Sequence, residues 1–398
     1  MDNNDLEEIP LSKTTKFIVD NRGKTVPTAS TGIPLIATNC IDNKNLYPRY
    51  ENIRFISQKT YDTWFRSHPQ PGDIILTLKG SQNGAVCLVP NPVEFVIAQD
   101  MVALRADENV IDPLFLFAAL RSTDVQVQIK NLDVSGVIPH FKKSDFDKLL
   151  LPYPARNTQQ IIGKIYFDFC KKIELLQRQN KTLEQFAETL FRQWFVEEAS
   201  EDWKIGRLDD VISVKGGTTP STTTPEFWNG TINWTSPRDL SNNTSLFLFD
   251  TERKITEKGL QQIGSGLLPI GTVLLSSRAP IGYLVITEIP VAINQGYIAI
   301  VCDKIVSNSF IYLWIKYNME TIISAANGSV FLEISKSTFK ELEIIIPSKE
   351  KLKFFDEIIE PLFQKIKTNI VEIKTLTQLR NALLPKLMSG EVRAEINE

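Results

Sequence analysis

The segments FKKSDFDKLLLPYP (141–154) and ISKSTFKELEIIIP (334–347) decide the fold, because they are two copies of one pattern. Lys143, Ser144 and Phe146 match Lys336, Ser337 and Phe339 at an offset of 193 residues. The same offset holds upstream, between RGKTVP (22–27) and KGGTTP (215–220), and downstream, where Thr182, Leu183 and Gln185 match Thr375, Leu376 and Gln378. One offset that recurs at three separated places indicates an internal duplication.

A long helical pattern follows each copy. In residues 156–199, mostly apolar side chains recur at alternating spacings of three and four: Ile162, Tyr166, Phe169, Ile173, Leu176, Asn180, Leu183, Ala187, Leu190 and Trp194. Residues 348–389 repeat the alternation with Phe355, Ile359, Leu362, Ile366, Asn369, Ile373, Leu376, Arg380, Leu383 and Leu387. This spacing is typical of a coiled-coil seam. We expect Pro361 to kink the second helix, and Pro385 to end or bend its last turn.

Each seam carries one asparagine, Asn180 in the first helix and Asn369 in the second. Subtracting the repeat offset places Asn369 level with Leu176 of the first helix. In an antiparallel pair with two-fold symmetry, the two asparagines would then face each other near the middle of the rod. We hypothesise that they do so and set the register of the pair; the alternative is that each faces solvent at a loose position.

The segments before the helices mix short β-like runs, such as DIILTL (73–78) and TVLLSS (272–277), with helical runs, such as DPLFLFAALRS (112–122). We therefore predict an α+β protein with two pseudo-repeated modules and two long helices. The modules span 1–155 and 203–347; the helices span 156–202 and, with the tail, 348–398. The helices are expected to form an antiparallel coiled coil with pseudo-two-fold symmetry.

The composition excludes several function classes. The 398 residues include 44 basic and 47 acidic side chains, so a uniformly basic nucleic-acid coat is excluded and any nucleic-acid binding must come from local patches. Four scattered cysteines and two histidines, His68 and His140, favour neither a disulfide framework nor a metal site. The acidic N-terminus and the lack of a long apolar stretch predict a cytoplasmic protein without a membrane span.

Three strings resemble one family closely: TLFRQWFVE (189–197), KGGTTPSTTTPEFWNGTINWTSPRDL (215–240) and LRNALLPKLMSGEVR (379–393). The family is the specificity subunit of type I restriction–modification enzymes, and the order of module and helix covers essentially the whole chain. The stretch RGKTVPTASTGIPLIATNCI (22–41) departs from it, since it lacks the Phe-Trp and Trp of the second module.

The resemblance implies a noncatalytic reader of double-stranded DNA. Each module would read one half of a split target, and the helical rod would set the gap between the halves. The helices would dock two modification subunits, and motor-nuclease restriction subunits would complete the complex. S-adenosylmethionine, ATP and magnesium would be bound by those partners, and no cofactor or metal by this chain.

Base reading needs polar side chains on loops that a rigid scaffold holds. The candidates in the first module are Arg22, Lys24, Thr25, Lys79, Ser81, Gln82, Asn83, His140, Lys142 and Lys143. The candidates in the second module are Lys215, Gly217, Thr218, Thr219, Arg278 and Lys336. Ordinary turns and solvated surface charges are the structural alternatives. Gln99 and Gln295 interrupt apolar runs and are read as buried structural amides instead.

Large apolar side chains gather at one end of each helix: Leu190, Phe191, Trp194 and Phe195, and Leu383, Leu384, Leu387 and Met388. They form either a docking patch for the modification subunit or the packing of the rod against its own modules.

Other functions have weaker support. Asp239, Glu252 and Lys254 have the spacing of a metal-dependent nuclease site, but the first repeat has no counterpart. NPVEF (91–95) and DPLF (112–115) only partly match a methyltransferase motif, and no phosphate-binding GxxxxGK[ST] loop is present. A noncatalytic alternative is a scaffold whose duplicated modules bind proteins instead of DNA.

Overall fold

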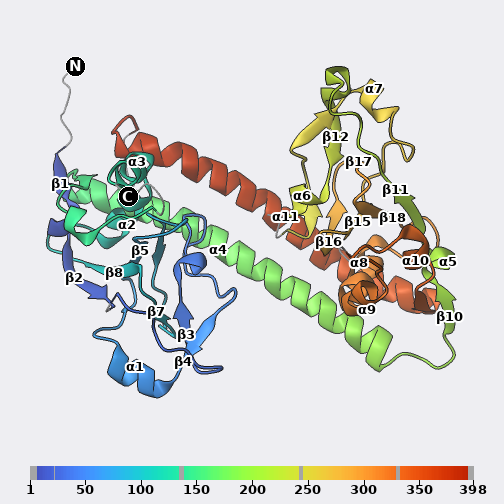
Figure 1. Cartoon of the computed structure of the whole chain (residues 1–398), viewed down its shortest axis with the longest axis horizontal. Coiled ribbons are helices and arrows are strands. Elements are labelled where there is room, and N and C mark those ends of the chain that lie inside the picture. The colour runs from blue at the N-terminus through green and yellow to red at the C-terminus, as the bar shows by residue number, and fades with distance from the viewer. Residues whose placement is uncertain (1–6, 22, 134–138, 242–244, 329–331, 393–398) are drawn as a thin grey trace. The chain divides into compact units, whose positions relative to one another are not determined.

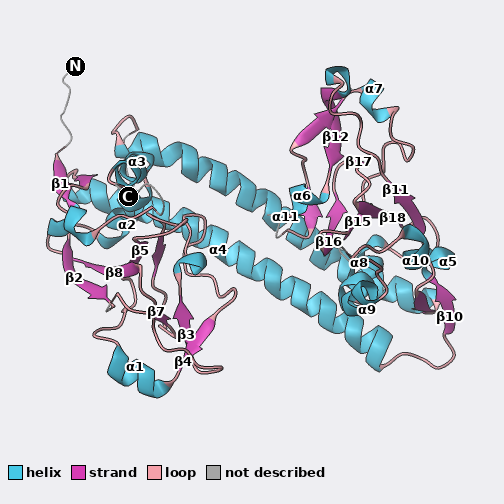
Figure 2. Cartoon of the chain, viewed as in Figure 1, coloured by secondary structure: helices cyan, strands magenta, loops and turns pink. Residues whose placement is uncertain are grey.

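The computed structural model describes residues 7–21, 23–133, 139–241, 245–328 and 332–392 (Figure 1). It divides into two compact units, called unit 1 (Met1–Gln177 with Glu372–Glu398) and unit 2 (Arg178–Val371). Each unit therefore holds one copy of the repeat and one stretch of each long helix. Helices and strands are intermixed in both units (Figure 2), as expected for an α+β fold.

Unit 1 is built around a four-stranded antiparallel sheet of order β2-β8-β5-β6. These strands are β2 (Thr15–Asp20), β8 (Met101–Ala106), β5 (Ile74–Thr77) and β6 (Val86–Leu88). A smaller sheet has the order β4-β3-β7, from β4 (Arg54–Ile56), β3 (Ile33–Ile36) and β7 (Val96–Ile97), and β1 (Glu8–Pro10) pairs with β9 (Leu150–Pro152). The helices of this module are α1 (Gln58–Trp64), α2 (Pro113–Arg121) and α3 (Thr123–Asn131), with short 3₁₀ turns at Leu11–Lys13, Thr38–Cys40 and Lys143–Asp145.

Unit 2 repeats this topology. Its larger sheet has the order β11-β18-β15-β16-β13, from β11 (Ser213–Gly216), β18 (Tyr297–Val301), β15 (Val273–Ser277), β16 (Ile281–Thr287) and β13 (Phe247–Leu248). The smaller sheet is β14-β12-β17, from β14 (Arg253–Ile255), β12 (Trp228–Thr235) and β17 (Ala292–Ile293), and β10 (Lys204–Arg207) pairs with β19 (Glu343–Ile346). The module's helices are α5 (Leu208–Val211), α6 (Pro237–Leu240), α7 (Glu257–Leu260), α8 (Asn308–Tyr317), α9 (Met319–Ser324) and α10 (Lys336–Lys340), with a 3₁₀ turn at Pro225–Phe227.

Every strand of the first module has a counterpart in the second, which confirms the predicted duplication. In both small sheets the central strand has one antiparallel and one parallel neighbour. The isolated bridge between Lys79 and His140 in unit 1 recurs between Arg278 and Glu333 in unit 2. Unit 2 adds β13, which pairs in parallel with β16 at the edge of the larger sheet.

The long helices begin and end close to the predicted bounds. Helix α4 spans Arg156–Arg192 and continues as a π-helical turn at Gln193–Glu197, and α11 spans Lys349–Met388. Helix α11 continues through Pro361 and past Pro385 to Met388, so Pro385 does not itself end the helix. A kink at Pro361 and a bend at Pro385 stay predictions. Leu384, Leu387 and Met388 are buried in the core of unit 1, and this packing holds the last turn in place.

Within each unit the two helical stretches pair antiparallel, as predicted. In unit 2, Asn180 of α4 meets Asn369 of α11, and further along α4 the Trp194 ring stacks on Phe354. In unit 1, Lys172 pairs with Glu372 at 3.1 Å, and Tyr166 lies beneath the Arg380 guanidinium. Residues with increasing numbers along α4 thus contact residues with decreasing numbers along α11. Every predicted seam position is buried or half-buried.

The asparagine hypothesis is confirmed as far as geometry goes. The Asn369 side-chain nitrogen donates to the side-chain amide oxygens of Asn180 and Gln179, each at 2.8 Å. Asn369 is fully buried and Asn180 nearly so, and therefore the solvent-facing alternative is wrong. Register setting by this pair stays a prediction.

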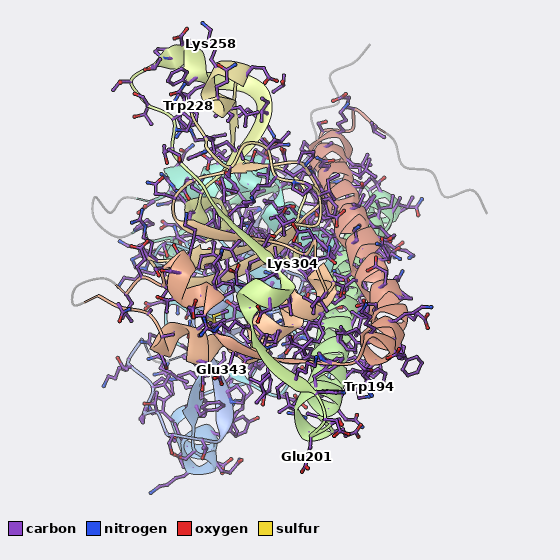
Figure 3. All side chains as sticks on the ribbon, turned by 90° about the vertical axis from the view of Figure 1, so that its right-hand side faces the viewer. Trp194, Glu201, Trp228, Lys258, Lys304 and Glu343 are labelled. Carbon is purple, nitrogen blue, oxygen red and sulfur yellow. The ribbon has the colours of Figure 1, made fainter. Side chains whose placement is uncertain are left out.

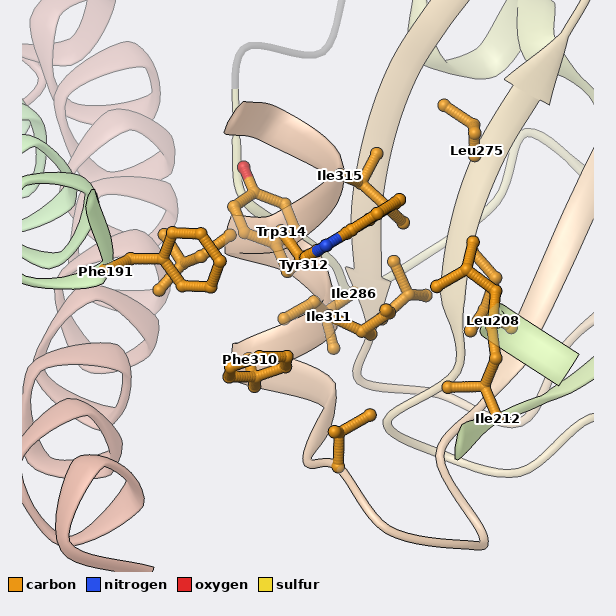
Figure 4. Packing of buried hydrophobic residues seen from close by; sticks show 14 of the residues in the cluster. Phe191, Leu208, Ile212, Leu275, Ile286, Phe310, Ile311, Tyr312, Trp314 and Ile315 are labelled. Carbon is orange, nitrogen blue, oxygen red and sulfur yellow. The ribbon is translucent and has the colours of Figure 1, made fainter. Parts of the chain in front are cut away.

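A hydrophobic helix forms the centre of each core. Helix α2 is capped by the Asp112 carboxylate, which accepts from the backbone of Leu114 and Phe115, and it packs between the sheet and the long helices of unit 1. In unit 2, Ser307 caps α8 in the same way. Figure 4 shows Phe310 and Tyr312 of α8 lying between Phe191 of α4 and the sheet residues Leu275 and Ile286. No helix formed by the described residues is long and apolar enough to cross a bilayer.

Candidate nucleic-acid interface

The predicted DNA-binding residues of unit 2 converge at one edge of its larger sheet. Strands β11 and β15 end at this edge and β18 begins there, since Gly216 pairs with Ile298 and Ser276 with Tyr297. The loops that leave the edge carry Gly217, Thr218, Thr219 and Arg278. Lys215 is the last residue but one of β11. The Lys336 side chain comes from α10 and lies against Gly216. A Cβ at position 216 would collide with this lysine side chain.

Hydrogen bonds hold the loop that follows β11 (residues 217–224, the second loop) in place. The Thr218 amide donates to the Ile293 carbonyl at 3.0 Å, and the Thr219 hydroxyl donates to the Gln295 side chain at 2.8 Å. A Cβ on Gly217 would overlap the Ile293 carbonyl oxygen. Gly217 is therefore required for the close approach of two protein segments, and its absent side chain is not evidence of contact with DNA.

Unit 1 presents the same edge. Strands β2 and β5 end there and β8 begins there, and Lys24 and Thr25 are exposed just beyond it. Lys79 pairs with His140 through a backbone bridge, and the Asn83 side chain accepts from the Phe141 amide at 3.3 Å. Of the remaining candidates, Ser81, Lys142 and Lys143 are exposed and Gln82 is half-buried. Arg22 lies outside the described residues.

The cations at the two edges have different surroundings. Lys143 forms an ion pair and hydrogen bond with Asp20. Lys336, its counterpart in the repeat, has no ion pair among the residues that the structure describes. Arg278 reaches Glu333 at 3.5 Å, but both side chains are substantially exposed, so this pair is weak.

Two further side chains of unit 2 differ from the sequence-based interpretation or were absent from it. Gln295 is exposed and accepts from Thr219, so the expectation of a buried amide is wrong, whereas Gln99 is half-buried. Arg253 on β14 was not among the candidates, yet it stacks on Trp228, whose ring nitrogen donates to the Ser221 carbonyl of the second loop. The tryptophans of EFWNGTINW (226–234) were the available signal, because exposed arginines often stack on such rings.

The apolar residues at the helix ends are mostly used inside their own modules. Phe191 and Phe195 lie in the core of unit 2, and Leu384, Leu387 and Met388 lie in that of unit 1. Leu190, Trp194 and Leu383 are half-buried. Burial therefore favours packing within the modules over partner docking for the five buried side chains: Phe191, Phe195, Leu384, Leu387 and Met388.

The proposed nuclease alternative has no support in the geometry. The Asp239 carboxylate accepts from the Thr235 hydroxyl and the Ser236 amide at 2.8 Å each, so it forms a capping box with Ser236, the N-cap residue of α6. Lys254 pairs with Asp250 at 2.5 Å, and Glu252 is exposed. Across the described ranges, no group of three or more His, Cys, Asp or Glu side chains could hold a metal ion.

Unit 2 separates its charged loop end from its aromatic helix end. Figure 3 shows Trp228 and Lys258 at one end of the unit, and Trp194 and Glu201 at the opposite end. A ligand bound at the loops and a partner bound at the helix end would therefore not compete for the same surface.

Comparison with known proteins identifies the two modules. The family model described as "Type I restriction modification DNA specificity domain" matches the chain twice, over residues 14–185 and 200–380. The type I restriction enzyme MjaIX specificity subunit of Methanocaldococcus jannaschii is 37% identical over 49% of this chain and 46% of its own length. The HindI specificity subunit of Haemophilus influenzae is 25% identical over 88% of this chain and 92% of its own length.

One solved structure has the same fold. The S subunit of a type I restriction–modification system from M. genitalium matches with a TM-score of 0.61 and 18% identity. The match covers 99% of this chain and 98% of that chain.

Proposed function

Since the chain belongs to the family of type I restriction–modification DNA specificity domains, we propose that it is a noncatalytic subunit that reads a split DNA target. One observation carries this proposal. Both modules gather exposed hydroxyls and cations, with amide side chains among them, at the equivalent edge of their larger sheets, which is the arrangement that base reading requires. Unit 1 would read one half-site and unit 2 the other.

The long helices would set the gap between the half-sites. Half-site separation fixes both distance and rotational phase on the duplex, and a flexible linker would preserve neither. Two weak half-site contacts joined by a stiff element also gain effective concentration. The continuous helix α11 and the buried seam within each unit support this role.

We further propose two modification subunits and motor-nuclease restriction subunits as partners. S-adenosylmethionine, ATP and magnesium would be bound by these subunits, so that all chemistry takes place outside this chain. The cytoplasm is the proposed location, because all four cysteines are free thiols.

Exposed positions that the repeat preserves support the docking of two copies of one partner. Phe186 on α4 and Leu379 on α11 are related by the repeat offset and are 50% and 51% exposed. The matched pairs Gln185 and Gln378, and Thr182 and Thr375, are exposed beside them. Packing does not explain identical exposed residues, whereas two equivalent docking surfaces do.

Long-read mapping of methylated bases, with and without this gene in its host, tests the proposed function. We expect a split motif with a fixed gap to be methylated only when the gene is present. An unchanged methylome would contradict DNA reading and would favour the scaffold alternative.

A further inference from the structure

We propose that the Arg253 guanidinium reads a guanine in the half-site bound by unit 2, which deepens the proposed function and rests on it. Arg253 lies on β14 directly opposite Trp234 of β12. Its guanidinium carbon lies 3.4 Å from the centre of the Trp228 ring and 5.4 Å from that of Trp234. The arginine is therefore stacked on a pair of tryptophans.

This aromatic platform is rigid. The two rings meet edge to face, with centroids 5.1 Å apart and planes at 89°, and both are buried. The Trp228 ring nitrogen donates to the Ser221 carbonyl at 2.9 Å, and that of Trp234 donates to the Thr218 carbonyl at 3.3 Å. The platform thus joins Arg253 to the loop that already carries predicted DNA-binding hydroxyls.

The donors of Arg253 remain unused by the protein. Among the described residues, no hydrogen bond or ion pair involves its guanidinium, and the residue is exposed. Arg121 shows the opposite situation, because it is buried and donates to the carbonyls of Val86 and Asp42. A stacked, immobilised guanidinium with free N–H groups has lost its conformational freedom before any ligand arrives, which favours a specific contact.

The surroundings favour a base edge over a phosphate. Lys254 and Lys258, the neighbouring cations, pair with Asp250 at 2.5 Å and Glu226 at 2.6 Å. Segment 250–258 has as many acidic as basic residues, so it attracts the phosphate backbone only weakly. The planar fork of arginine matches the O6 and N7 acceptors of guanine in the major groove, and this geometry benefits from a fixed side chain.

The first module lacks this device. Arg54 occupies the equivalent place on β4, opposite Leu35 instead of a tryptophan. It is exposed, and no cation–π contact to it is found in the described part of the chain. The contrast restricts the inference to Arg253.

Selection from double-stranded DNA with a randomised 30-base-pair region (about three helical turns) tests the inference. The full chain, assembled with its modification subunits, would be compared with Arg253→Lys, Arg253→Ala and the control Arg207→Lys. Arg207 is an exposed arginine of unit 2 that pairs with Glu341, and it stacks on no ring of the residues that the structure describes. Thermal melting would confirm that all variants fold.

We expect Arg253→Lys to keep the charge but to lose the preference for guanine at one position of one half-site by at least about fivefold. The other half-site and the gap should be unchanged, and Arg207→Lys should select the parent motif. An unchanged motif in Arg253→Lys would overturn the inference alone. A second result would also overturn it: Arg253→Ala lowers the affinity for all sequences by the same factor and lowers the slope of log affinity against log salt by about one. That result indicates a phosphate contact. A parent complex that selects no motif would overturn the proposed function as well.

Discussion

Two lysines at equivalent positions of the repeat differ in their partners. Lys143 forms an ion pair with Asp20. The Lys336 side chain instead lies over Gly216, in the space that a side chain at position 216 would fill. A lysine that already has a carboxylate partner gains less from a phosphate, because the ion pair must be exchanged. The two modules therefore need not hold the DNA backbone equally.

We predict that Lys336→Ala lowers the slope of log affinity against log salt by about one, as expected for the loss of one phosphate contact. The affinity should fall for all sequences alike, since a phosphate carries no sequence information. Lys143→Ala should have a smaller effect on both quantities. Fluorescence anisotropy with the parent target duplex at several salt concentrations measures them.

Lys353→Ala provides the control, since this lysine is exposed on α11, away from the sheet edge. Equal changes of slope in Lys336→Ala and Lys143→Ala would show that the Asp20 pair has no influence.

At the residue scale, the repeat selected candidate loops that the structure brings to one sheet edge, but it did not reveal what each side chain contacts. Lys336 was selected because the repeat aligns it with Lys143, and the structure shows that Arg278 occupies the place of Lys79, since each forms the equivalent backbone bridge. Arg253 was missed, because its stacking depends on the register between β12 and β14, which includes a bulge. The role of Gly217 likewise depends on a distant carbonyl, which no local pattern reveals.

At the scale of elements, the long helices were the most predictable part of the chain. Their seam is a local periodicity of many residues, and tertiary packing reinforces it. The ends of α4 and α11 also lie close to the predicted bounds, but contacts within the modules, and not a local pattern, hold the last turn of α11 in place. Pro385 illustrates this: the burial of Leu384 and Leu387 outweighs a local signal for termination.

The buried amide pair of Asn180 and Asn369 gives a prediction at this scale. Asn369→Leu leaves the Asn180 amide without its partner in a buried seam, which should cost about 1–3 kcal/mol of unfolding free energy. Asn180→Leu should cost less, because the Asn369 nitrogen keeps its bond to the Gln179 side chain. The double leucine variant should recover much of the loss, because no buried amide of the pair then remains unsatisfied.

Urea denaturation of the parent, the two single variants and the double variant measures this coupling. Thr368→Leu is the control, since Thr368 is exposed on α11 next to Asn369, and its stability should change little. Additive losses in the double variant would mean that the two amides do not depend on each other.

At the scale of the whole molecule, duplication is the feature that links fold to assembly. Each unit has its own core and sheet edge, and each has one member of the exposed pair Phe186 and Leu379. A chain that presents the same surface twice can bind two copies of one partner by the same contacts. The duplication thus explains how one chain could position two modification subunits on one split target.

We predict that Phe186→Asp and Leu379→Asp each reduce the number of modification subunits bound per chain from two to one, because a buried carboxylate at either surface opposes docking. The double variant should bind none. Native mass spectrometry of the co-expressed complex counts the subunits directly. Leu175→Asp is the matched control: Leu175 is 41% exposed on α4, but its counterpart in the repeat is Thr368, so it belongs to no repeated apolar surface. This control should still bind two modification subunits. A Phe186→Asp/Leu379→Asp double variant that also binds two would contradict docking at the repeated helix face and would favour docking at the half-buried Leu190, Trp194 and Leu383.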